Sequence, residues 1–343
     1  MPISQGGRGW CRAVFVVNSF SVSAALTIRT IAAHERDAVL DLLNGWLDRS
    51  FFARYFDHDP TFRDDLCFVA DDGGRLVSTL QVFRKQVRVD GAIVAVGGVG
   101  NVYTDPGYRD GGVASQLLTH AIAAMQEHEF DLSLLFASRI DFYGRLGWQS
   151  HLRYLSFIEA GDPAPPVSAS ESFDAGRDLN DVMALYNSHS GSIAGATVRD
   201  RAYWRGQLQY AGNPDERFVV ARRDGRVIAY ARSAMLYDFP TILEHGCAPA
   251  GESALADLLG ELHRGAVPGT LAQLVPSQNL EALLRDRGLA VRSVEDRSWM
   301  WRLLDPAKLA ATLRIPTAAV QAPGFLEDLF PPLQTRYWLS DRF

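Results

Sequence analysis

The sequence predicts a mixed α/β (α+β) fold in which a mostly antiparallel sheet is flanked by helices. Alternating apolar and polar segments joined by short turns indicate strands, and segments with apolar residues at helical spacing indicate amphipathic helices. The same order of elements recurs in the second half of the chain, which indicates a duplicated unit. With 343 residues the chain is too long for one ordinary core. We therefore expect two domains of about 150 residues each, with shorter tails.

The first unit is expected to begin with a strand and two helices and to continue as a meander. Residues 26–31 alternate as a strand does, residues 39–47 have helical spacing, and the aromatic-rich segment 51–62 is interpreted as a second helix leading into a loop. Strands are predicted at 66–70, 75–89 and 93–103, because Asp71-Asp72-Gly73-Gly74 and Asp90-Gly91 are strong turn signals. A glycine-rich turn, a helix and an apolar strand at 132–136 follow, so the sheet gains a parallel strand late.

The second unit repeats this order without the glycine-rich turn. The proline-rich segment 161–170 is the predicted linker, and beyond it a helix (179–187), a strand (218–221), an Asp-Gly turn and another strand (227–235) echo the first unit. Where the glycine-rich turn would fall, residues 244–251 have no matching spacing, and a helix at 253–262 follows. We interpret the second copy as degenerate and structural.

These patterns divide the chain into four predicted segments: 1–25, 26–160, 161–303 and 304–343. The first is interpreted as a disordered leader or an over-long start, because Asn18 and Ser19 break its modest apolar run, and we exclude it from the fold. The last begins with a helix over 309–313 that Asp305 and Pro306 cap, and it ends in an aromatic-rich tail. Disordered tails seldom have this composition. We expect it to pack back toward the active site.

Composition excludes several classes of function. The net charge of −6 argues against a nucleic-acid binder, because phosphate backbones need a basic face. No apolar run reaches the length of a membrane span. Cys11, Cys67 and Cys247 lie far apart, which suits reduced thiols in a cytosol rather than a disulfide framework or a zinc site. We therefore expect a cytoplasmic protein with no metal, no nucleic-acid partner and no membrane partner.

The glycine-rich turn has the chemistry of a phosphate site. It reads Arg109-Asp110-Gly111-Gly112-Val113-Ala114-Ser115 and opens an amphipathic helix. Two glycines let backbone N–H groups converge, the helix dipole attracts an anion, and the arginine adds a positive charge. A plain strand-to-helix connection can have the same pattern, so the pattern alone leaves both readings open. The spaced glycines of a dinucleotide fold and the lysine of a nucleoside triphosphate loop are absent.

The residues around the turn extend the pattern to a family resemblance. Residues 102–114 resemble motif A of the GNAT acyltransferase superfamily, and the strand 132–136 with Phe142-Tyr143-Gly144-Arg145-Leu146-Gly147-Trp148 resembles motif B. More narrowly, Val96-Gly97-Gly98-Val99, Ala137-Ser138 and the arginine and tryptophan element at 201–205 are similar to the Eis (enhanced intracellular survival) N-acetyltransferases. The resemblance covers residues 26–303 and is specific in 96–148. It implies tandem GNAT folds, the second degenerate, and acetyl-CoA as co-substrate.

The resemblance also assigns roles residue by residue. The backbone of Val102, Tyr103 and Thr104 would pair with the pantetheine arm like an added strand. The pyrophosphate would lie in the turn, whose residues are Arg109 at the rim and Asp110, Gly111, Gly112, Val113, Ala114 and Ser115. Ser138 and Arg139 would line the far side of the cleft, and Tyr143 would stand beside the sulfur as the general acid.

The acid and the base each have an alternative reading. A phenol with a pKa near 10 can protonate the thiolate that leaves when an amine attacks a thioester; otherwise Tyr143 is an aromatic residue that only packs. In the Eis family the carboxylate of the last residue is the proposed base, which implies the carboxylate of Phe343 here; otherwise this terminus docks only for stability.

Two features depart from the family. Arg139 stands where an acidic residue is usual, and the sterol-carrier-like third domain is cut to the residues after Leu303.

We therefore expect an acetyl-CoA-dependent N-acetyltransferase that acts by direct transfer to a primary amine of a small molecule or of lysine. The acceptor can be aminoglycoside-like or polyamine-like. A homo-oligomer is a further possibility for the assembly of the chain. Two alternatives remain. One is an aminoacyl or peptide transferase on the same tandem scaffold, and the other is a non-catalytic acyl-CoA-binding regulatory protein.

Overall fold

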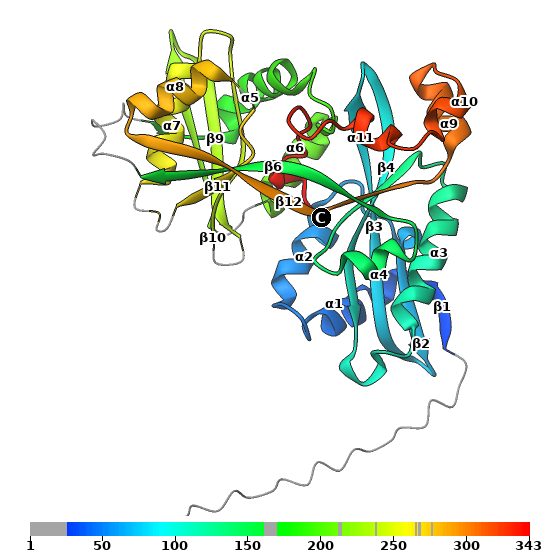
Figure 1. Ribbon diagram of the computed structural model, residues 1–343. Coiled ribbons are helices and arrows are strands. Elements are labelled where there is room, and N and C mark those ends of the chain that lie inside the picture. Colours follow the sequence, from blue (N-terminus) through cyan, green and yellow to red (C-terminus); the bar gives the residue numbers. More distant parts are fainter. Residues whose placement is uncertain are drawn as a thin grey trace, which may run out of the picture.

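The structure is a computed structural model that describes residues 26–160, 170–211, 215–236, 239–264, 266, 269–275 and 277–343. The expected leader, 1–25, and all but the last residue of the expected linker, 161–170, lie outside these residues. The described strands form one continuous sheet in the order β1-β2-β3-β4-β5-β12-β6-β11-β10-β9-β8-β7. Helices cover both ends of this sheet (Figure 1). The predicted fold class, a mixed and mostly antiparallel sheet flanked by helices, is confirmed.

The strands fall into two sets of six along the chain. The first set is β1 (Thr27–Thr30), β2 (Cys67–Asp72), β3 (Arg75–Val89), β4 (Ala92–Thr104), β5 (Leu132–Phe136) and β6 (Gln149–Ala160). The second set is β7 (Glu171–Ser172), β8 (Arg217–Arg223), β9 (Arg226–Leu236), β10 (Phe239–Cys247), β11 (Thr270–Ala272) and β12 (Leu289–Leu303). The strands predicted at 75–89 and 132–136 coincide with β3 and β5.

The two halves of the sheet have the same topology and exchange their sixth strands. In the first half β4 and β5 are parallel, and in the second half β10 and β11 are parallel, while the other described pairs are antiparallel. β12 pairs with β5, and β6 pairs with β11. Each sixth strand therefore completes the half to which it does not belong in sequence. The duplication predicted from the order of elements is present, but it forms one sheet and not two.

The predicted helices are present with ends shifted by up to four residues. The described helices are α1 (Arg36–Leu43), α2 (Arg49–His58), α3 (Val113–Glu127), α4 (Ile140–Gly144), α5 (Ala175–Ser190), α6 (Arg201–Tyr210), α7 (Glu252–His263), α8 (Gln278–Asp286), α9 (Pro306–Leu313), α10 (Thr317–Val320) and α11 (Phe325–Leu329). Of these, α6, α8, α10 and α11 were not predicted. The second helix was expected to lead into a loop by residue 62, and it ends at His58. Asp59 has an extended backbone (ψ 111°) because the following Pro60 disfavours the helical region.

The Asp-Gly turns have the backbone conformation that the sequence predicts. Asp90 and Gly91 join β3 to β4 with φ of 46° and 76°, and Asp224 and Gly225 join β8 to β9 with φ of 52° and 77°. Two successive left-handed residues match the right-handed twist of the flanking strands, and aspartate followed by glycine is the pair best suited to them. These turns set the register of the two long hairpins.

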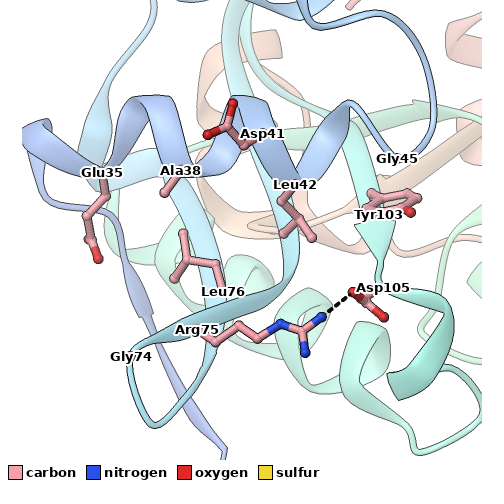
Figure 2. A pocket seen from close by; sticks show the side chains of 10 residues that line it. All are labelled: Glu35, Ala38, Asp41, Leu42, Gly45, Gly74, Arg75, Leu76, Tyr103 and Asp105. Carbon is pink, nitrogen blue, oxygen red and sulfur yellow. Dashed lines mark hydrogen bonds and ion pairs between the residues drawn. The ribbon is translucent and has the colours of Figure 1, made fainter.

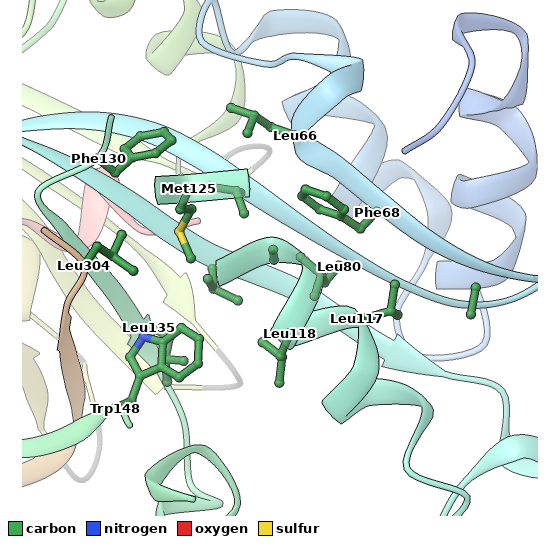
Figure 3. Close-up of a cluster of buried hydrophobic side chains, with 14 of the residues drawn as sticks. Leu66, Phe68, Leu80, Leu117, Leu118, Met125, Phe130, Leu135, Trp148 and Leu304 are labelled. Atoms are coloured by element: carbon green, nitrogen blue, oxygen red, sulfur yellow. The ribbon is translucent and has the colours of Figure 1, made fainter. Parts of the chain in front are cut away.

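The core of the first half lies between the sheet and α3 (Figure 3). The buried face of α3 carries Val113, Leu117, Leu118, Ala121 and Met125. Side chains from β2, β3 and β4 and the ring of Trp148 complete the cluster. This packing fixes the N-terminal end of α3 relative to the end of β4, where the glycine-rich turn lies.

The C-terminal segment packs onto the body. Asp305 caps α9 by accepting a hydrogen bond from the backbone N–H of Lys308 (2.9 Å). Farther on, the ring of Phe330 stacks on Trp301 of β12 with 4.2 Å between centroids. Figure 1 shows the C-terminus where the two halves of the sheet meet. Among the described residues, no helix is long and apolar enough to cross a membrane.

We predict that Leu118→Ala lowers the free energy of unfolding by about 3 kcal/mol, because a fully buried leucine leaves a cavity when it is truncated. Leu118 is 0% exposed, whereas Leu333 is 59% exposed. The matched control Leu333→Ala should change stability by less than about 0.5 kcal/mol. Urea denaturation followed by circular dichroism measures both values. Equal losses in the two variants would show that the cluster around α3 is not a tight core.

Candidate active site

The site begins where β4 and β5 part. The two strands pair only at Val96 with Leu132, Gly97 with Ser133 and Gly98 with Leu134. Beyond this point β4 continues to Thr104 and β5 to Phe136 without pairing with each other. Backbone N–H and C=O groups in the open wedge can therefore bind another molecule.

A bulge in β4 lies in this open wedge. Gln81 of β3 pairs with Gly100, whereas Thr79 pairs with Tyr103, so β4 has one residue more than β3 over this interval. Asn101 lies inside the interval with a left-handed φ of 53°, and its amide donates a hydrogen bond to Gln81 Oε1 (3.1 Å). A bulge turns backbone groups away from the hydrogen bonds of the sheet. This bulge lies in the part of β4 that borders the wedge. The sequence analysis missed this feature, although Gly100-Asn101 is a pair suited to it.

A cleft of about 1430 Å³ opens from the wedge toward the start of α3. Its lining includes eleven of the twelve residues predicted to bind acetyl-CoA: Val102, Tyr103, Thr104, Arg109, Asp110, Gly112, Val113, Ala114, Ser115, Ser138 and Arg139. Gly111 does not line the cleft. The predicted acid Tyr143 lines it, and so do eight residues that were not predicted: Gly45, Trp46, Tyr108, Ile140, Asp141, Phe142, Arg145 and Leu146.

The glycine-rich turn leaves the first N–H groups of α3 open to the cleft. Gly112 is the N-cap of α3 with φ 76°, and no side chain caps this helix end. A methyl group on Gly112 would have no atom within 4 Å, so the space beside it is empty. Unpaired N–H groups and the positive end of the helix dipole meet in this space. The turn therefore has both the room and the charge to hold an anion.

Polar contacts hold the strand end and the turn in place. Asp105 accepts a hydrogen bond from the N–H of Gly107 (2.9 Å) and forms an ion pair with Arg75 (2.8 Å). Arg109 donates to the carbonyl oxygen of Thr104 (3.1 Å), so its guanidinium stays at the rim. The hydroxyl of Tyr108 donates to Asp72 (2.6 Å), which ties the turn to the β2–β3 hairpin.

A smaller hollow of about 450 Å³ adjoins the cleft. Tyr103 and Gly45 line both, and a methyl group on Gly45 would lie 2.4 Å from the Tyr103 hydroxyl. Figure 2 shows the carboxylates of Glu35, Asp41 and Asp105 around this hollow, with Arg75 paired to the last of them. Glu35 is paired with Arg29 (2.7 Å) and Asp41 with Arg49, so these charges already have partners.

The corresponding connection in the second half has no room for an anion. β10 ends at Cys247 and α7 begins at Glu252, so the connection is short and has no glycine-rich turn. A methyl group on Gly251, the N-cap of α7, would lie 2.5 Å from the carbonyl oxygen of Ile228. Backbone atoms therefore fill the place where the first half has an open cradle.

Tyr143 lies on α4 at the far wall of the cleft. Its ring packs edge-on against Phe142 (5.0 Å between centroids) and Trp148 (6.2 Å). Burial raises the pKa of Tyr143 to about 12, against a smaller opposing effect of Arg139. The phenol therefore keeps its proton through the physiological range, which is the state that a proton donor needs.

Phe343 does not line the cleft but lies beside the wedge. Its ring stacks on Phe83 (5.4 Å between centroids) and lies 5.7 Å from the ring of Phe136. A methyl group on Gly98 would lie 2.4 Å from this ring, and one on Gly100 would lie 3.1 Å from the carboxyl carbon of Phe343. The two glycines thus make room for the last residue on β4. Its carboxyl group lies beside the bulge.

The parted strands, the turn and the helix that carries Tyr143 define the class of the protein as a GNAT fold. Residues 27–150 match the family profile of the acetyltransferase (GNAT) domain. Two curated proteins of Streptomyces griseus, both described as uncharacterized N-acetyltransferases, are 30% identical over 274 residues. The match covers 69% of this chain and 63% of each relative.

Solved structures share the fold over most of the chain. A probable N-acyltransferase from Enterococcus faecalis has a TM-score of 0.66 at 15% identity, covering 84% of this chain and 75% of that one. Eis1 from Mycobacterium abscessus has a TM-score of 0.55 at 16% identity, covering 81% and 74%. Residues 27–150 of this chain therefore form an acetyltransferase (GNAT) domain. The resemblance to Eis is confirmed in the fold.

We predict that Tyr143 remains un-ionised at pH 10, where a free phenol is half ionised. Because burial raises its pKa, the folded protein keeps this proton after the unfolded chain has begun to lose it. The resulting stability is present below pH 10 and is lost as the pH rises toward 12. Phenolate absorbance of the wild type minus that of Tyr143→Phe measures the ionisation. A difference signal with its midpoint near pH 10 would contradict the buried environment.

Proposed function

We propose that this protein is an acetyl-CoA-dependent N-acetyltransferase that transfers the acetyl group directly to a primary amine of a small molecule or of a lysine. One observation carries the proposal: an open, uncapped helix start and an unpaired strand edge line the same cleft as a half-buried, protonated tyrosine. This combination fits a long thioester with a diphosphate at one end. The family match and the names of the curated relatives support the same reaction.

The geometry of the cleft supports the proposed cofactor-binding roles. The diphosphate would accept hydrogen bonds from the N–H groups at the start of α3, with Arg109 supplying positive charge at the rim. The amide groups of the pantetheine arm would pair with the free edge of β4 at Val102, Tyr103 and Thr104. A strand-like pairing of this kind directs the thioester into the wedge, beside the bulge at Asn101.

The transfer step needs a base, an electrophile activator and an acid. The carboxylate of Phe343 takes a proton from the ammonium group of the acceptor, and the free amine attacks the carbonyl carbon of the thioester. A backbone N–H of β4 hydrogen-bonds to the carbonyl oxygen as it gains negative charge. The C–S bond breaks, and the thiolate takes its proton from the Tyr143 hydroxyl. The attacking nitrogen loses its remaining extra proton as the amide forms, and this proton restores the Tyr143 phenol, while the proton held by the Phe343 carboxylate passes to solvent. The products are the acetylated amine and free CoA.

We predict that Tyr143→Phe lowers kcat by about 100-fold and leaves KM for acetyl-CoA within about twofold, because only the departing thiolate needs the hydroxyl. Release of free thiol measures the rate, with aminoglycosides, polyamines, amino acids and lysine peptides as acceptors. The phenylalanine ring keeps the packing against Trp148, so circular dichroism should not change. An unaltered kcat would remove Tyr143 from the role of acid.

The same assay separates the proposed function from its two alternatives. Calorimetric titration with CoA comes first, and an aminoacyl or peptide transferase that uses a larger activated donor would not bind it. A non-catalytic regulatory protein would bind CoA but would release no thiol with any amine. Binding together with thiol release is the result that the proposal requires.

We predict that two different changes, one after the chain end and one in β4, displace the carboxylate of Phe343 and so remove the proposed base. A few residues added after Phe343 remove its carboxylate from the site, and Gly98→Ala displaces its ring, because a methyl group there would lie 2.4 Å from the ring. Each change should lower kcat by tenfold to about 100-fold, since small misplacements of reacting groups have effects of this size. CoA binding, measured by calorimetry, should not change.

The matched control for the added residues is the same peptide placed before Met1. Intact mass spectrometry establishes that Phe343 is the last residue of the unmodified protein. If the C-terminal addition leaves kcat unchanged, the carboxylate of Phe343 is not the base, and the rest of the proposed mechanism stands.

A further inference from the structure

We propose that the second half of the sheet is a positioning device for the first: Arg199 and Glu244, which are buried in the second half, hold Asp341 so that Phe343 reaches the wedge beside β4. This inference rests on the proposed function, in which the carboxylate of Phe343 is the base. Arg199 precedes α6, and Glu244 belongs to β10. Neither residue lines the cleft.

The anchor is a fully buried network of charges. Arg199 Nε donates to Asp341 Oδ1 (3.0 Å) and Arg199 Nη2 donates to Asp341 Oδ2 (2.7 Å). The same Nη2 also contacts Glu244 Oε2 (2.7 Å). The three side chains are 0% exposed. Two parallel hydrogen bonds from a planar guanidinium fix both the position and the orientation of the Asp341 carboxylate.

Neutral groups of the second half complete the shell around Asp341. The Tyr203 hydroxyl and Gln207 Nε2, both on α6, each donate to Asp341 Oδ1 (3.0 Å). Gln207 also donates to the carbonyl oxygen of Ser340 (3.1 Å), and the Ser340 hydroxyl contacts Glu244. Both the side chain and the backbone of the terminal segment are therefore held, two residues before Phe343.

The anchor is also tied to the first half. Lys85 of β3 donates to the Tyr203 hydroxyl (2.9 Å), and its ammonium group pairs with Asp59 at 3.3 Å. Lys85 and Asp59 are buried. The same tyrosine thus accepts a hydrogen bond from the first half and donates one to the terminal segment, so the network fixes the segment relative to β3 and, through β3, to its neighbour β4.

β10 presents a docking face where β4 presents a wedge. By topology β10 is the counterpart of β4. Leu339 packs on Leu243 of β10, and the ring of Trp338 lies 5.1 Å from the ring of His245. The Trp338 indole also donates to Ser190 of α5 (3.1 Å). The second copy has lost its anion cradle, and its central strand now seats residues 338–341.

Electrostatics favour a positioning role over a stabilising one. Removing several charges from water costs nearly as much as their attraction returns, so a buried ionic network adds little net stability. It does impose one geometry, because a carboxylate that left its partners would remain buried and unpaired. Burial opposes the charge of Glu244, but Arg199 and, after it, Arg232 lower the pKa of this carboxyl to about 2. Burial likewise opposes the charge of Arg199, but Asp341 and Glu244 raise the pKa of its guanidinium well above the ordinary value. Arg199 and Glu244 therefore keep their charges at every pH at which the enzyme is assayed.

The test is Asp341→Asn in the full chain, which keeps the shape of the side chain but removes its charge. We expect kcat to fall by tenfold to about 100-fold while KM for acetyl-CoA stays within about twofold, because the cleft shares no residue with the anchor. The loss should be largest at low pH and should shrink as the pH approaches the pKa of the acceptor amine, because an unprotonated amine needs no base. Carboxypeptidase should also release Phe343 faster, as measured by mass spectrometry.

Two further variants separate positioning from folding. Asp178→Asn is the matched control, because Asp178 is equally buried in the second half but pairs with Arg177 and Arg222. It should lower the melting temperature without changing kcat, the pH profile or the release of Phe343. Tyr203→Phe removes one hydroxyl from the shell of Asp341 and keeps the ring, so a few-fold loss of kcat with the same pH dependence is expected even if Asp341→Asn does not fold.

Wild-type kcat and pH profile in folded Asp341→Asn or Tyr203→Phe would overturn the inference, even if Phe343 were released faster. A fall in kcat that is the same at every pH, or that Asp178→Asn reproduces, would overturn it as well. Failure of the proposed function looks different. In that case the wild type itself releases no thiol with any amine. If residues added after Phe343 leave its activity intact, only the proposed role of its carboxylate as the base fails.

Discussion

The structure depends on the parting of β4 from β5 after three paired residues. Each strand edge in the wedge carries backbone groups that need partners, and no neighbouring strand can supply them. On the cleft side these groups face a space lined by the turn, the start of α3 and Tyr143. On the other side Phe343 lies against Gly98 and Gly100. The wedge therefore lies between an open cleft and a residue that is distant in sequence.

A strand that loses its neighbour must be held from its other edge. β12 supplies this support, since Trp299–Leu303 pairs along the whole of β5, from Phe136 back to Leu132. Because β12 comes from the end of the second half and β6 from the end of the first, neither half can complete its sheet alone. The exchange pairs β5 along its other edge, while β4 carries its bulge beside the wedge. It also brings the following segment, residues 304–343, back to the first half.

Local chemistry explains which features the sequence could predict. Asp90-Gly91 specifies its own turn, the alternation of 75–89 specifies a strand, and Gly111-Gly112 before an amphipathic helix specifies an open helix start. The exchange of β6 and β12 depends on pairing between distant strands, and either strand could have closed its own half. The anchor at Asp341 was also missed, because Arg199, Glu244 and Asp341 are separated by 45 to 142 positions and each resembles a surface charge in sequence. The docking of the terminal segment was predictable from its aromatic residues, but the partner that receives it was not.

The two copies show how a duplicated fold can divide its work. One difference in the connection after the fourth strand separates them. In the first copy Gly112 has φ 76° and open space beside it. In the second copy a methyl group on Gly251 would lie 2.5 Å from the carbonyl oxygen of Ile228. A copy without a cradle is free to bury charged residues on its central strand, and Glu244 is such a residue. The degenerate copy can thus contribute to chemistry through what it holds, with no reacting group of its own.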